Sequence, residues 1–240
     1  MFQLYHIYDK LKSIMIDIKS DTIFSEIGGG IAAWVPSDVS GGDLAAATAS
    51  AVEMGCDLIS VAPSNISVVW PWLEHKCPQI LARFYLKTDA TTMDAAISEL
   101  AINANAAFKA GACGVQVFLS MADLAVFCRQ IHIVRDDLFF NKKLCVGIDI
   151  SEIGSGDWGR VFDSLSMIRA DAIVLALARD TGGKSDFVGR IYGMLNTATT
   201  WNGAFHFTLG NNLFRIEQVW RLILALRPGI ARDARFFVTK

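Results

Sequence analysis

Short apolar runs rich in branched residues alternate with longer segments rich in Ala and Leu along the whole chain. Eight of the short runs have the length of β-strands. Their starts recur about every 29 residues, the length of one strand, one helix and a return. The predicted strands are Ile31–Asp38, Asp57–Pro63, Gln79–Lys87, Cys113–Ser120, Lys143–Ile150, Asp171–Ala178, Gly203–Gly210 and Ala234–Lys240.

The segments between these runs begin and end as helices do. Thr91–Asp94 opens an Ala-rich stretch in the manner of a capping box, because a threonine oxygen can accept from an amide of the first turn. Gly111 and Gly55 end two helices, since glycine tolerates the left-handed conformation at a helix end. Similar sequence segments at 54–59, 110–115 and 169–174 each join the end of a helix to the start of a strand, which indicates equivalent corners of a repeated unit.

Eight strands separated by helices predict an α/β fold with parallel strands, because only crossover connections fit between the strands. We predict a TIM (β/α)8 barrel forming a single domain over residues 1–240. The alternative is an open, doubly wound sheet, which usually carries a glycine-rich turn after its first strand. Here Gly28–Gly30 precedes the first strand, and this order argues against a dinucleotide-binding fingerprint.

The two ends of the chain complement each other. The eighth predicted strand runs to Lys240 with no helix after it, whereas the amphipathic segment Phe2–Ile18 precedes the first strand. In a ring, the element before the first strand also follows the eighth. The N-terminal helix is therefore expected in the place of the eighth helix, and a plug at the bottom of the barrel is the alternative that would also bury its apolar stripe.

Composition narrows the class of protein. Of the 240 residues, 52% are hydrophobic and 19% are charged, and the formal net charge is −2. No basic run exceeds Lys142–Lys143, so nucleic acid is not an expected partner. No apolar run approaches the roughly 18 residues of a membrane span, and residues 1–20 lack the apolar core of a secretory signal. Five cysteines without a CxxC pair predict free thiols, a cytoplasmic location and no zinc site. No other metal and no cofactor is predicted.

Catalytic groups of such barrels gather at the C-terminal ends of the strands. If the branched aliphatic residues face the helices, their neighbours point into the barrel. This alternation predicts an inward polar set from four strands, with Ser60 as a further member. The set is Arg83, Tyr85, Lys87, Gln116, Ser120, Asp149, His206 and Thr208.

Three roles follow from the chemistry of this set. Asp149 and His206 are a candidate acid/base couple in which the carboxylate fixes the imidazole tautomer. Arg83 and Lys87 are candidate anchors for an anionic substrate, and a desolvated Lys87 beside Arg83 is suited to imine formation. Tyr85, Gln116, Ser120 and Thr208 are candidate substrate-binding residues. Each is also compatible with a structural polar group whose hydrogen bonds are satisfied inside the barrel.

Two loops add candidate substrate-binding groups. Gly182 and Gly183 lie in a loop that enters a helix N-terminus, where free amides can hold an anion, although an ordinary turn would look the same. Gly210 and Asn211 follow the seventh strand, where many barrels bind phosphate. The acidic residues of 152–157 have no histidine or second acidic strand end beside them, so no metal site is predicted.

The stretch Thr91–Ser120, the run Ile59–Asn65 and the glycine after the seventh strand resemble the class I aldolases, especially the deoxyribose-phosphate aldolases. That resemblance implies a TIM barrel and imine chemistry from lysines of strands six and seven. Here strand six contains no lysine, and strand seven carries His206 and Phe207. The strand-four acid of that family falls near Gln116. The aldolase chemistry of that family is therefore not expected in its usual form.

Two hypotheses for function follow. The first is an aldolase-, lyase- or isomerase-like enzyme that acts on a small anionic metabolite, such as a phosphorylated sugar, by proton transfer or carbon–carbon cleavage. The second is a non-catalytic barrel that binds a ligand or a protein. Apolar residues on several faces of Ile66–Leu73 and Phe214–Leu226, including Trp70, Trp72 and Trp220, also predict a homodimer or higher oligomer.

Overall fold

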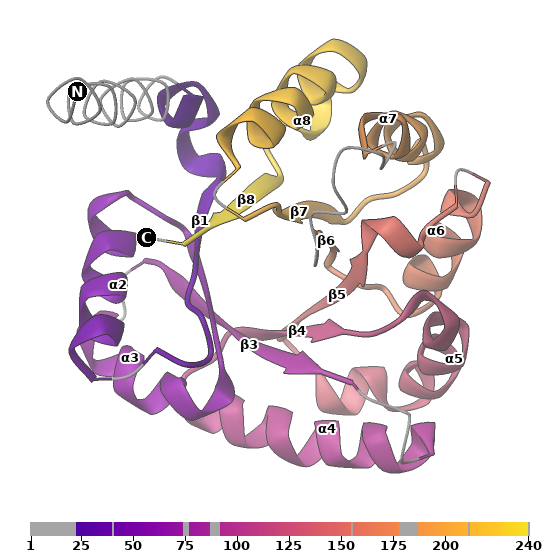
Figure 1. Cartoon of the computed structure of the whole chain (residues 1–240). Helices are drawn as coiled ribbons and strands as arrows, with labels where there is room; N and C mark the ends of the chain where they lie inside the picture. The colour runs from indigo at the N-terminus through magenta and orange to yellow at the C-terminus, as the bar shows by residue number, and fades with distance from the viewer. Residues whose placement is uncertain are drawn as a thin grey trace, which may run out of the picture.

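The computed structural model describes residues 23–39, 41–73, 77–86, 92–154, 156–177, 187–210 and 212–239. They form a closed barrel of eight parallel strands in chain order, which confirms the predicted TIM barrel and excludes the open sheet (Figure 1). The strands are β1 Ile31–Trp34, β2 Leu58–Val61, β3 Gln79–Tyr85, β4 Gly114–Phe118, β5 Lys143–Asp149, β6 Ala172–Ala176, β7 Ala204–Thr208 and β8 Ala234–Val238.

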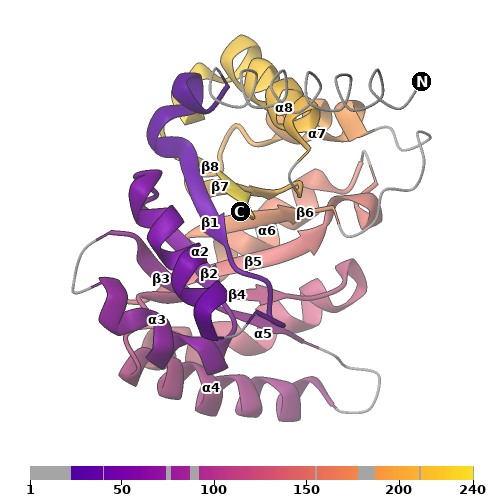
Figure 2. The same ribbon diagram turned by 60° about the vertical axis from the view of Figure 1, so that its left-hand side comes forward.

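The helices form a ring around this barrel (Figures 1 and 2). Each of α2 to α8 follows the strand before it and crosses back over the outer face. The helices are α2 Gly41–Glu53, α3 Ile66–Leu73, α4 Met93–Lys109, α5 Met121–Leu138, α6 Trp158–Met167, α7 Phe187–Thr197 and α8 Leu213–Leu226. Short 3-10 turns lie at η1 Gly28–Gly30, η2 Pro63–Asn65, η3 Ile150–Glu152 and η4 Pro228–Ile230. No helix in the described ranges is long and apolar enough to cross a membrane.

All eight predicted strands are present, but most are shorter at their ends than the sequence suggested. The first, predicted to Asp38, ends at Trp34, and the second ends at Val61. The apolar run extends past β1 because the residue that follows the strand is still buried and still donates its amide to β2, at 3.0 Å from the Ser60 carbonyl. Val35, for example, is 1% exposed although it lies beyond β1.

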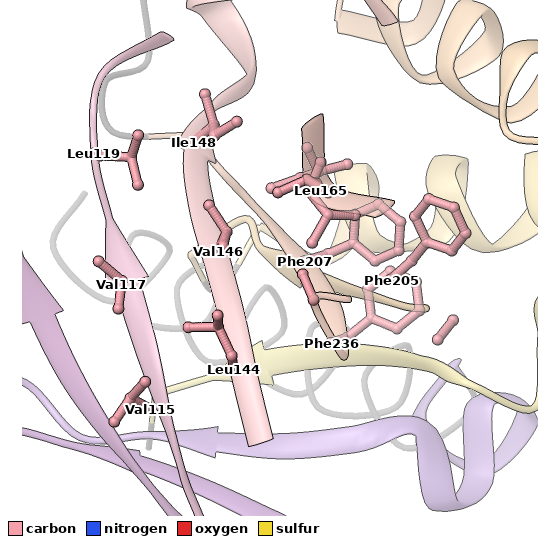
Figure 3. Close-up of a cluster of buried hydrophobic side chains, with 14 of the residues drawn as sticks. Val115, Val117, Leu119, Leu144, Val146, Ile148, Leu165, Phe205, Phe207 and Phe236 are labelled. Carbon is pink, nitrogen blue, oxygen red and sulfur yellow. The ribbon is translucent and has the colours of Figure 1, made fainter. Parts of the chain in front are cut away.

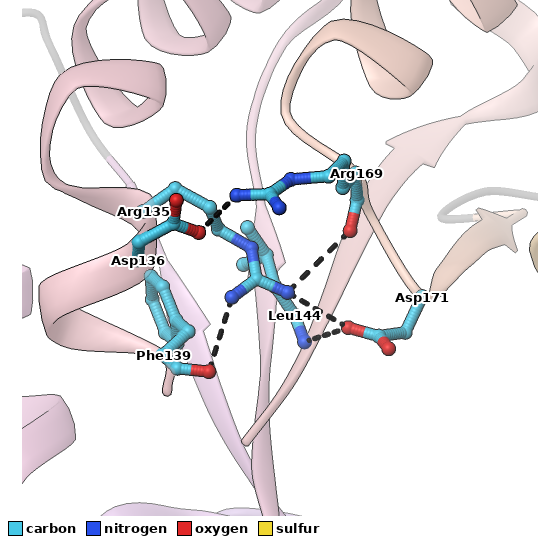
Figure 4. Close-up of polar contacts among 6 residues, drawn as sticks. All are labelled: Arg135, Asp136, Phe139, Leu144, Arg169 and Asp171. Atoms are coloured by element: carbon cyan, nitrogen blue, oxygen red, sulfur yellow. Dashed lines mark hydrogen bonds and ion pairs between the residues drawn. The ribbon is translucent and has the colours of Figure 1, made fainter. Parts of the chain in front are cut away.

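Several of the corners between a helix and the next strand contain a residue with positive φ. Gly55 and Gly111 have φ of 67° and 113°, as expected for left-handed helix ends. Arg169 occupies the equivalent place before β6 with φ of 49°, an uncommon conformation for a residue with a side chain. Figure 4 shows the contacts there: Asp171 accepts from the Leu144 amide at 2.8 Å and from Arg135 at 3.3 Å, and Arg169 pairs with Asp136. These bonds join α5, β5 and β6 at the N-terminal end of the barrel.

Apolar side chains pack in two shells. The larger shell lies between the strands and the helices, and Figure 3 shows part of it, where residues of β4 and β5 such as Val117 and Val146 lie near Leu165 and the phenylalanines of β7 and β8. The smaller shell fills the barrel interior and includes Leu58, Leu81 and Val174. Because neighbouring residues of a strand point to opposite shells, every polar residue on the inner face has a defined direction.

The chain enters the barrel beside α8. Residues 23–27 are helical, and Ile23 and Ile27 are buried in the outer shell. Glu26 forms an ion pair with Arg221 of α8 at 3.1 Å, so this turn packs in the gap that a helix after β8 would fill (Figure 1). The predicted helix Phe2–Ile18 lies outside the described residues. The single domain over residues 1–240 stays a prediction.

Candidate functional site

A cavity of about 480 Å³ opens at the C-terminal ends of the strands. This is the end where barrels of this kind carry their active sites. Its wall combines apolar residues with a few polar side chains at the rim. The residues that line it are Trp34, Tyr85, Leu86, Phe118, Leu119, Ser120, Gly147, Asp149, Glu152, Ala176, Leu177, Thr208, Gly210, Phe237 and Thr239.

Four aromatic rings from four strands line the inner part of this cavity, and we call Trp34, Phe118, Phe237 and Tyr85 the aromatic floor. Trp34 contacts Phe118 and Phe237 edge to face, with ring centroids 5.8 and 6.2 Å apart. Tyr85 stacks on Phe118 at 5.2 Å. Gly147 leaves the space for the Phe118 ring, since a Cβ there would lie 2.3 Å from it. The floor therefore presents an apolar, aromatic surface to any ligand.

Asp149 is the last residue of β5 and brings a carboxylate to the cavity wall. Its Oδ1 accepts from the amide of Ser151 at 2.8 Å, which orients the carboxylate at the start of η3. Glu152, from the same turn, accepts from the amide of Met121 at 2.7 Å. Two carboxylates thus lie on the cavity wall, each held by a backbone amide, and no basic side chain is among the described residues that line it.

Four of the predicted binding residues line the cavity as expected from their place on the strands: Tyr85, Ser120, Thr208 and Gly210. Ser120 also caps α5, because its oxygen accepts from the Asp123 amide at 3.2 Å and its hydroxyl donates to the Asp123 carboxylate at 2.7 Å. Part of the hydrogen-bonding capacity of Ser120 is therefore used within the protein. Tyr85, at 58% exposure, is the most accessible ring of the floor.

Arg83 and Gln116 point into the barrel, but they do not line the cavity. The expectation that they reach the mouth is wrong. Arg83 donates to the carbonyl of Val35 at 2.6 Å and to Ser60 at 3.4 Å, and Ser60 donates to Gln116 at 2.6 Å. Arg83 also lies 3.9 Å from the ring centre of Trp34. The aromatic floor therefore separates this polar cluster from the cavity.

His206 also points into the barrel without lining the cavity, so the predicted couple of Asp149 and His206 in one cavity is wrong. Its Nδ1 has no hydrogen-bond partner, and its ring lies 5.4 Å from that of Phe237. Burial, together with the smaller effect of the nearby cations Arg235 and Lys143, lowers the pKa of His206 to about 3. The alternation of residues along β7 correctly predicted that His206 faces the barrel interior. However, His206 lies two residues before Thr208 on that face, and only Thr208 lines the cavity.

Four predicted site residues lie outside the described residues: Lys87, Asn211, Gly182 and Gly183. Lys87 follows Leu86 directly in the sequence, and Leu86 lines the cavity. Within the described ranges, no group of three histidine, cysteine or acidic side chains is arranged to hold a metal ion.

Comparison with known proteins relates this geometry to other barrels. No family model matches the sequence, and no curated protein matches it. The fold resembles that of the deoxyribose-phosphate aldolases. The tetrameric deoxyribose-phosphate aldolase of Aeropyrum pernix superposes with a TM-score of 0.65 at 12% identity, over 90% of this chain and 87% of its own. A protein of Toxoplasma gondii ME49 assigned as a deoxyribose-phosphate aldolase gives 0.67 at 14% identity, over 94% and 92%.

Other functions share this fold. A Streptococcus agalactiae protein assigned as the copper homeostasis protein CutC superposes with a TM-score of 0.58 at 9% identity, over 87% of this chain and 97% of its own. At such identities the likeness establishes the fold. The inward positions of β6 are Ala172, Val174 and Ala176, so the deoxyribose-phosphate aldolase resemblance does not extend to a lysine on that strand.

Two rings of the floor, Trp34 and Phe237, are not among the predicted site residues. The run Ile31–Trp34 is apolar throughout, so it gave no alternation from which to orient Trp34. In β8, Phe236 and Phe237 are adjacent, and one faces each shell. A search for aromatic residues near the ends of all eight strands would have found both.

Proposed function

We propose that this protein is an enzyme that acts on a small anionic metabolite by acid/base proton transfer or carbon–carbon cleavage in the cavity at the mouth of the barrel. The observation that carries the proposal is the Asp149 carboxylate at the end of β5, on the wall of that cavity. A carboxylate fixed by a backbone amide above an apolar floor is a suitable proton acceptor or donor for a bound substrate.

In the proposed reaction, the substrate lies on the aromatic floor and Asp149 transfers a proton at a carbon or hydroxyl next to a carbonyl. Lys87 is the candidate amine for an imine with that carbonyl, a step that releases one water molecule. Thr208, Ser120 and the Gly210 backbone are candidate hydrogen-bonding groups at the rim. His206 has no direct part, because it does not line the cavity.

The anionic group of the substrate needs a positive partner. Asp149 and Glu152 repel anions, so a cation must offset them. The proposed sources are Lys87 and the amides of Gly182, Gly183 and Asn211 at the strand ends. Replacing Lys87 by Met is therefore expected to weaken binding of anionic substrates more than that of neutral analogues.

The test compares Asp149→Asn with the matched variant Asp163→Asn, whose side chain lies exposed on α6. Proton exchange and product formation are followed by NMR on a panel of small aldehydes, ketones and sugar phosphates. The expected result is turnover by the wild type and by Asp163→Asn, and a loss of about 100-fold or more in Asp149→Asn with an unchanged melting temperature. Equal turnover in Asp149→Asn would overturn the role of Asp149.

The second candidate function is a barrel that binds a ligand or protein without catalysis. The apolar character of the aromatic floor favours it, because three of the four rings, those of Trp34, Phe118 and Phe237, offer no ionisable group near the bound molecule. Saturable binding of a panel member to the wild type, with no proton exchange or product in the same sample, would favour this function over the first.

A homodimer or higher oligomer remains part of the proposal, as does a cytoplasmic location suited to the buried thiols of Cys56, Cys128 and Cys145. Of the three tryptophans behind the oligomer prediction, Trp220 is buried against Phe236 and Trp70 covers Gly111 within the chain. Trp72 is 64% exposed and supports an interface on α3.

The oligomer prediction is tested by light scattering at micromolar concentration. We expect a dimer or larger species for the wild type and a monomer for Trp72→Ser, because removal of a large apolar side chain weakens an interface. Val126→Ser on α5, which replaces another exposed apolar side chain, is the control and is expected to assemble as the wild type does. A monomeric wild type would refute the prediction.

A further inference from the structure

Arg83 carries a buried positive charge that has no negative partner among the residues that the structure describes. Its side chain is 3% exposed, and both hydrogen bonds that it makes are to neutral oxygens, the Val35 carbonyl and the Ser60 hydroxyl. Buried charges are normally paired, because a charge taken out of water loses its favourable solvation. Burial lowers the pKa of the guanidinium, yet arginine keeps its proton at neutral pH. Within the described part of the chain, no acidic side chain therefore balances the charge of Arg83.

The same place has a surplus of hydrogen-bond donors. Nε of Arg83 and Nε2 of Gln116 are buried without an acceptor. The two residues are direct neighbours in the β3–β4 register and lie on the same inner face. Ser60 connects them, since it accepts from Arg83 and donates to Gln116. Two unpartnered donors beside an unpaired cation are the groups that an oxyanion binds.

Trp34 separates this cluster from the cavity. One side of its indole lies 3.9 Å from the Arg83 guanidinium, and the ring is also part of the cavity lining. Its other aromatic contacts are edge-to-face contacts with Phe118 and Phe237, and it is only half-buried. A rotation of the indole away from Arg83 would bring the guanidinium into contact with the cavity.

We propose that Arg83 and Gln116 form an oxyanion site beneath Trp34, and that this site receives the carboxylate or phosphate end of the ligand when the indole turns aside. The inference rests on the proposed function for the anionic ligand. It adds a second binding place for an anionic group, inside the barrel, to the one proposed at Lys87 and the loop amides, and it identifies Trp34 as the residue that controls access to this second place. A free inorganic oxyanion has the same chemistry, so the experiment must separate the two sources.

The first measurement uses sodium formate, the smallest carboxylate, at constant ionic strength maintained with a bulky sulfonate buffer. Formate is expected to raise the melting temperature of the wild type saturably and to change the tryptophan fluorescence, because a ligand that binds only the folded state stabilises it. Arg83→Met should weaken formate binding by tenfold or more. Arg221→Met, which removes an exposed arginine paired with Glu26, is the matched control and should bind formate as the wild type does.

Gln116→Met provides a second variant that keeps the charge of Arg83 and removes one donor. It is expected to weaken formate binding by about threefold to tenfold, and it keeps the proposal testable if Arg83→Met does not fold. Trp34→Phe should keep the site but remove the fluorescence change. An equal rise in melting temperature in the wild type and in every folded site variant, or no effect of formate on the wild type, would overturn the proposal.

The second measurement separates a ligand-borne anion from a free ion by comparing pyruvate with formate. Both carry one carboxylate, but pyruvate has a body that would remain in the cavity. Pyruvate binding at least tenfold tighter than formate, and weakened by Phe118→Leu while formate binding is unchanged, would support the ligand-borne site. Equal affinities would leave a site for free ions and overturn that part. Asp149→Asn should not weaken formate binding, because it removes a negative charge and leaves Arg83 and Gln116 in place, so a failed catalytic role and a failed anion site are distinguishable.

Discussion

The buried imidazole of His206 predicts how the stability of this protein depends on pH. His206 is 4% exposed, and its pKa is lowered from the ordinary value of 6.5 to about 3 by burial and by two nearby cations, Arg235 and Lys143. Between pH 7 and pH 5 the His206 imidazole is therefore protonated in the unfolded chain but stays neutral in the folded chain. Acidification favours the state that binds more protons, which is the unfolded one.

The magnitude follows from the two pKa values. At pH 7 the imidazole of His206 is mostly neutral in both the folded and the unfolded chain. At pH 5 it is almost fully protonated in the unfolded chain and still neutral in the folded chain. The free energy of unfolding should then fall by about 2 kcal/mol over this range because of His206. Other groups titrate as well, so the effect is measured as the difference between the wild type and His206→Gln.

The assay is urea denaturation at pH 7 and pH 5, followed by circular dichroism. The wild type should lose about 2 kcal/mol more than His206→Gln between the two pH values. His132→Gln, which removes an exposed histidine of α5, should follow the wild type. Parallel curves for the wild type and His206→Gln would refute the reasoning. A wild type that gains stability from His206 on acidification would show a raised pKa, as pairing with a carboxylate such as Asp149 would produce.

Two further predictions test the packing and the corners. Gly147→Ala should cost about 1–3 kcal/mol of stability and displace Phe118 from the floor, because the new Cβ would lie 2.3 Å from that ring. Gly193→Ala, in α7, is the control and should gain about 0.5–1 kcal/mol, since its Cβ would make an ordinary 3.6 Å contact. Asp171→Asn should cost about 1 kcal/mol at low salt, because Arg135 loses its charged partner and the carboxylate is partly exposed. Urea denaturation measures all three, and unchanged midpoints would contradict these expectations.

The repeated pattern made the fold predictable. Parallel strands with crossover helices leave few topologies, and eight units of equal length close into a barrel. The same alternation placed Arg83, Gln116 and Asp149 on the inner face correctly, because the branched neighbours of each residue pack against the helices. These inferences needed only the two-residue period of a strand.

The height of each residue within the barrel could not be read in that way. His206 and Thr208 share a face of β7, yet only Thr208 lines the cavity. Height depends on the tilt and stagger of the strands and on which side chains close the space above a residue. Trp34 closes that space over Arg83 from a strand whose sequence has no alternation. The predicted site residues therefore lie on the correct inner face of the barrel. Some of them line the cavity, and others lie beneath the aromatic floor.

The division of the interior into two levels also limits the chemistry available at each. Above the aromatic floor, Asp149 lines the cavity, where its proposed role is proton transfer with a ligand. His206 lies below the floor and cannot act as a base at the mouth of the barrel. Arg83 also lies below the floor and can contact a ligand in the cavity only if the Trp34 ring moves. Binding of the anionic end and proton transfer at Asp149 would then occur on opposite sides of one indole ring. A ligand that spans both levels must displace the Trp34 indole. Replacing Trp34 by a smaller residue is therefore expected to raise both the association rate and the affinity of such a ligand, because the ligand no longer has to displace the ring.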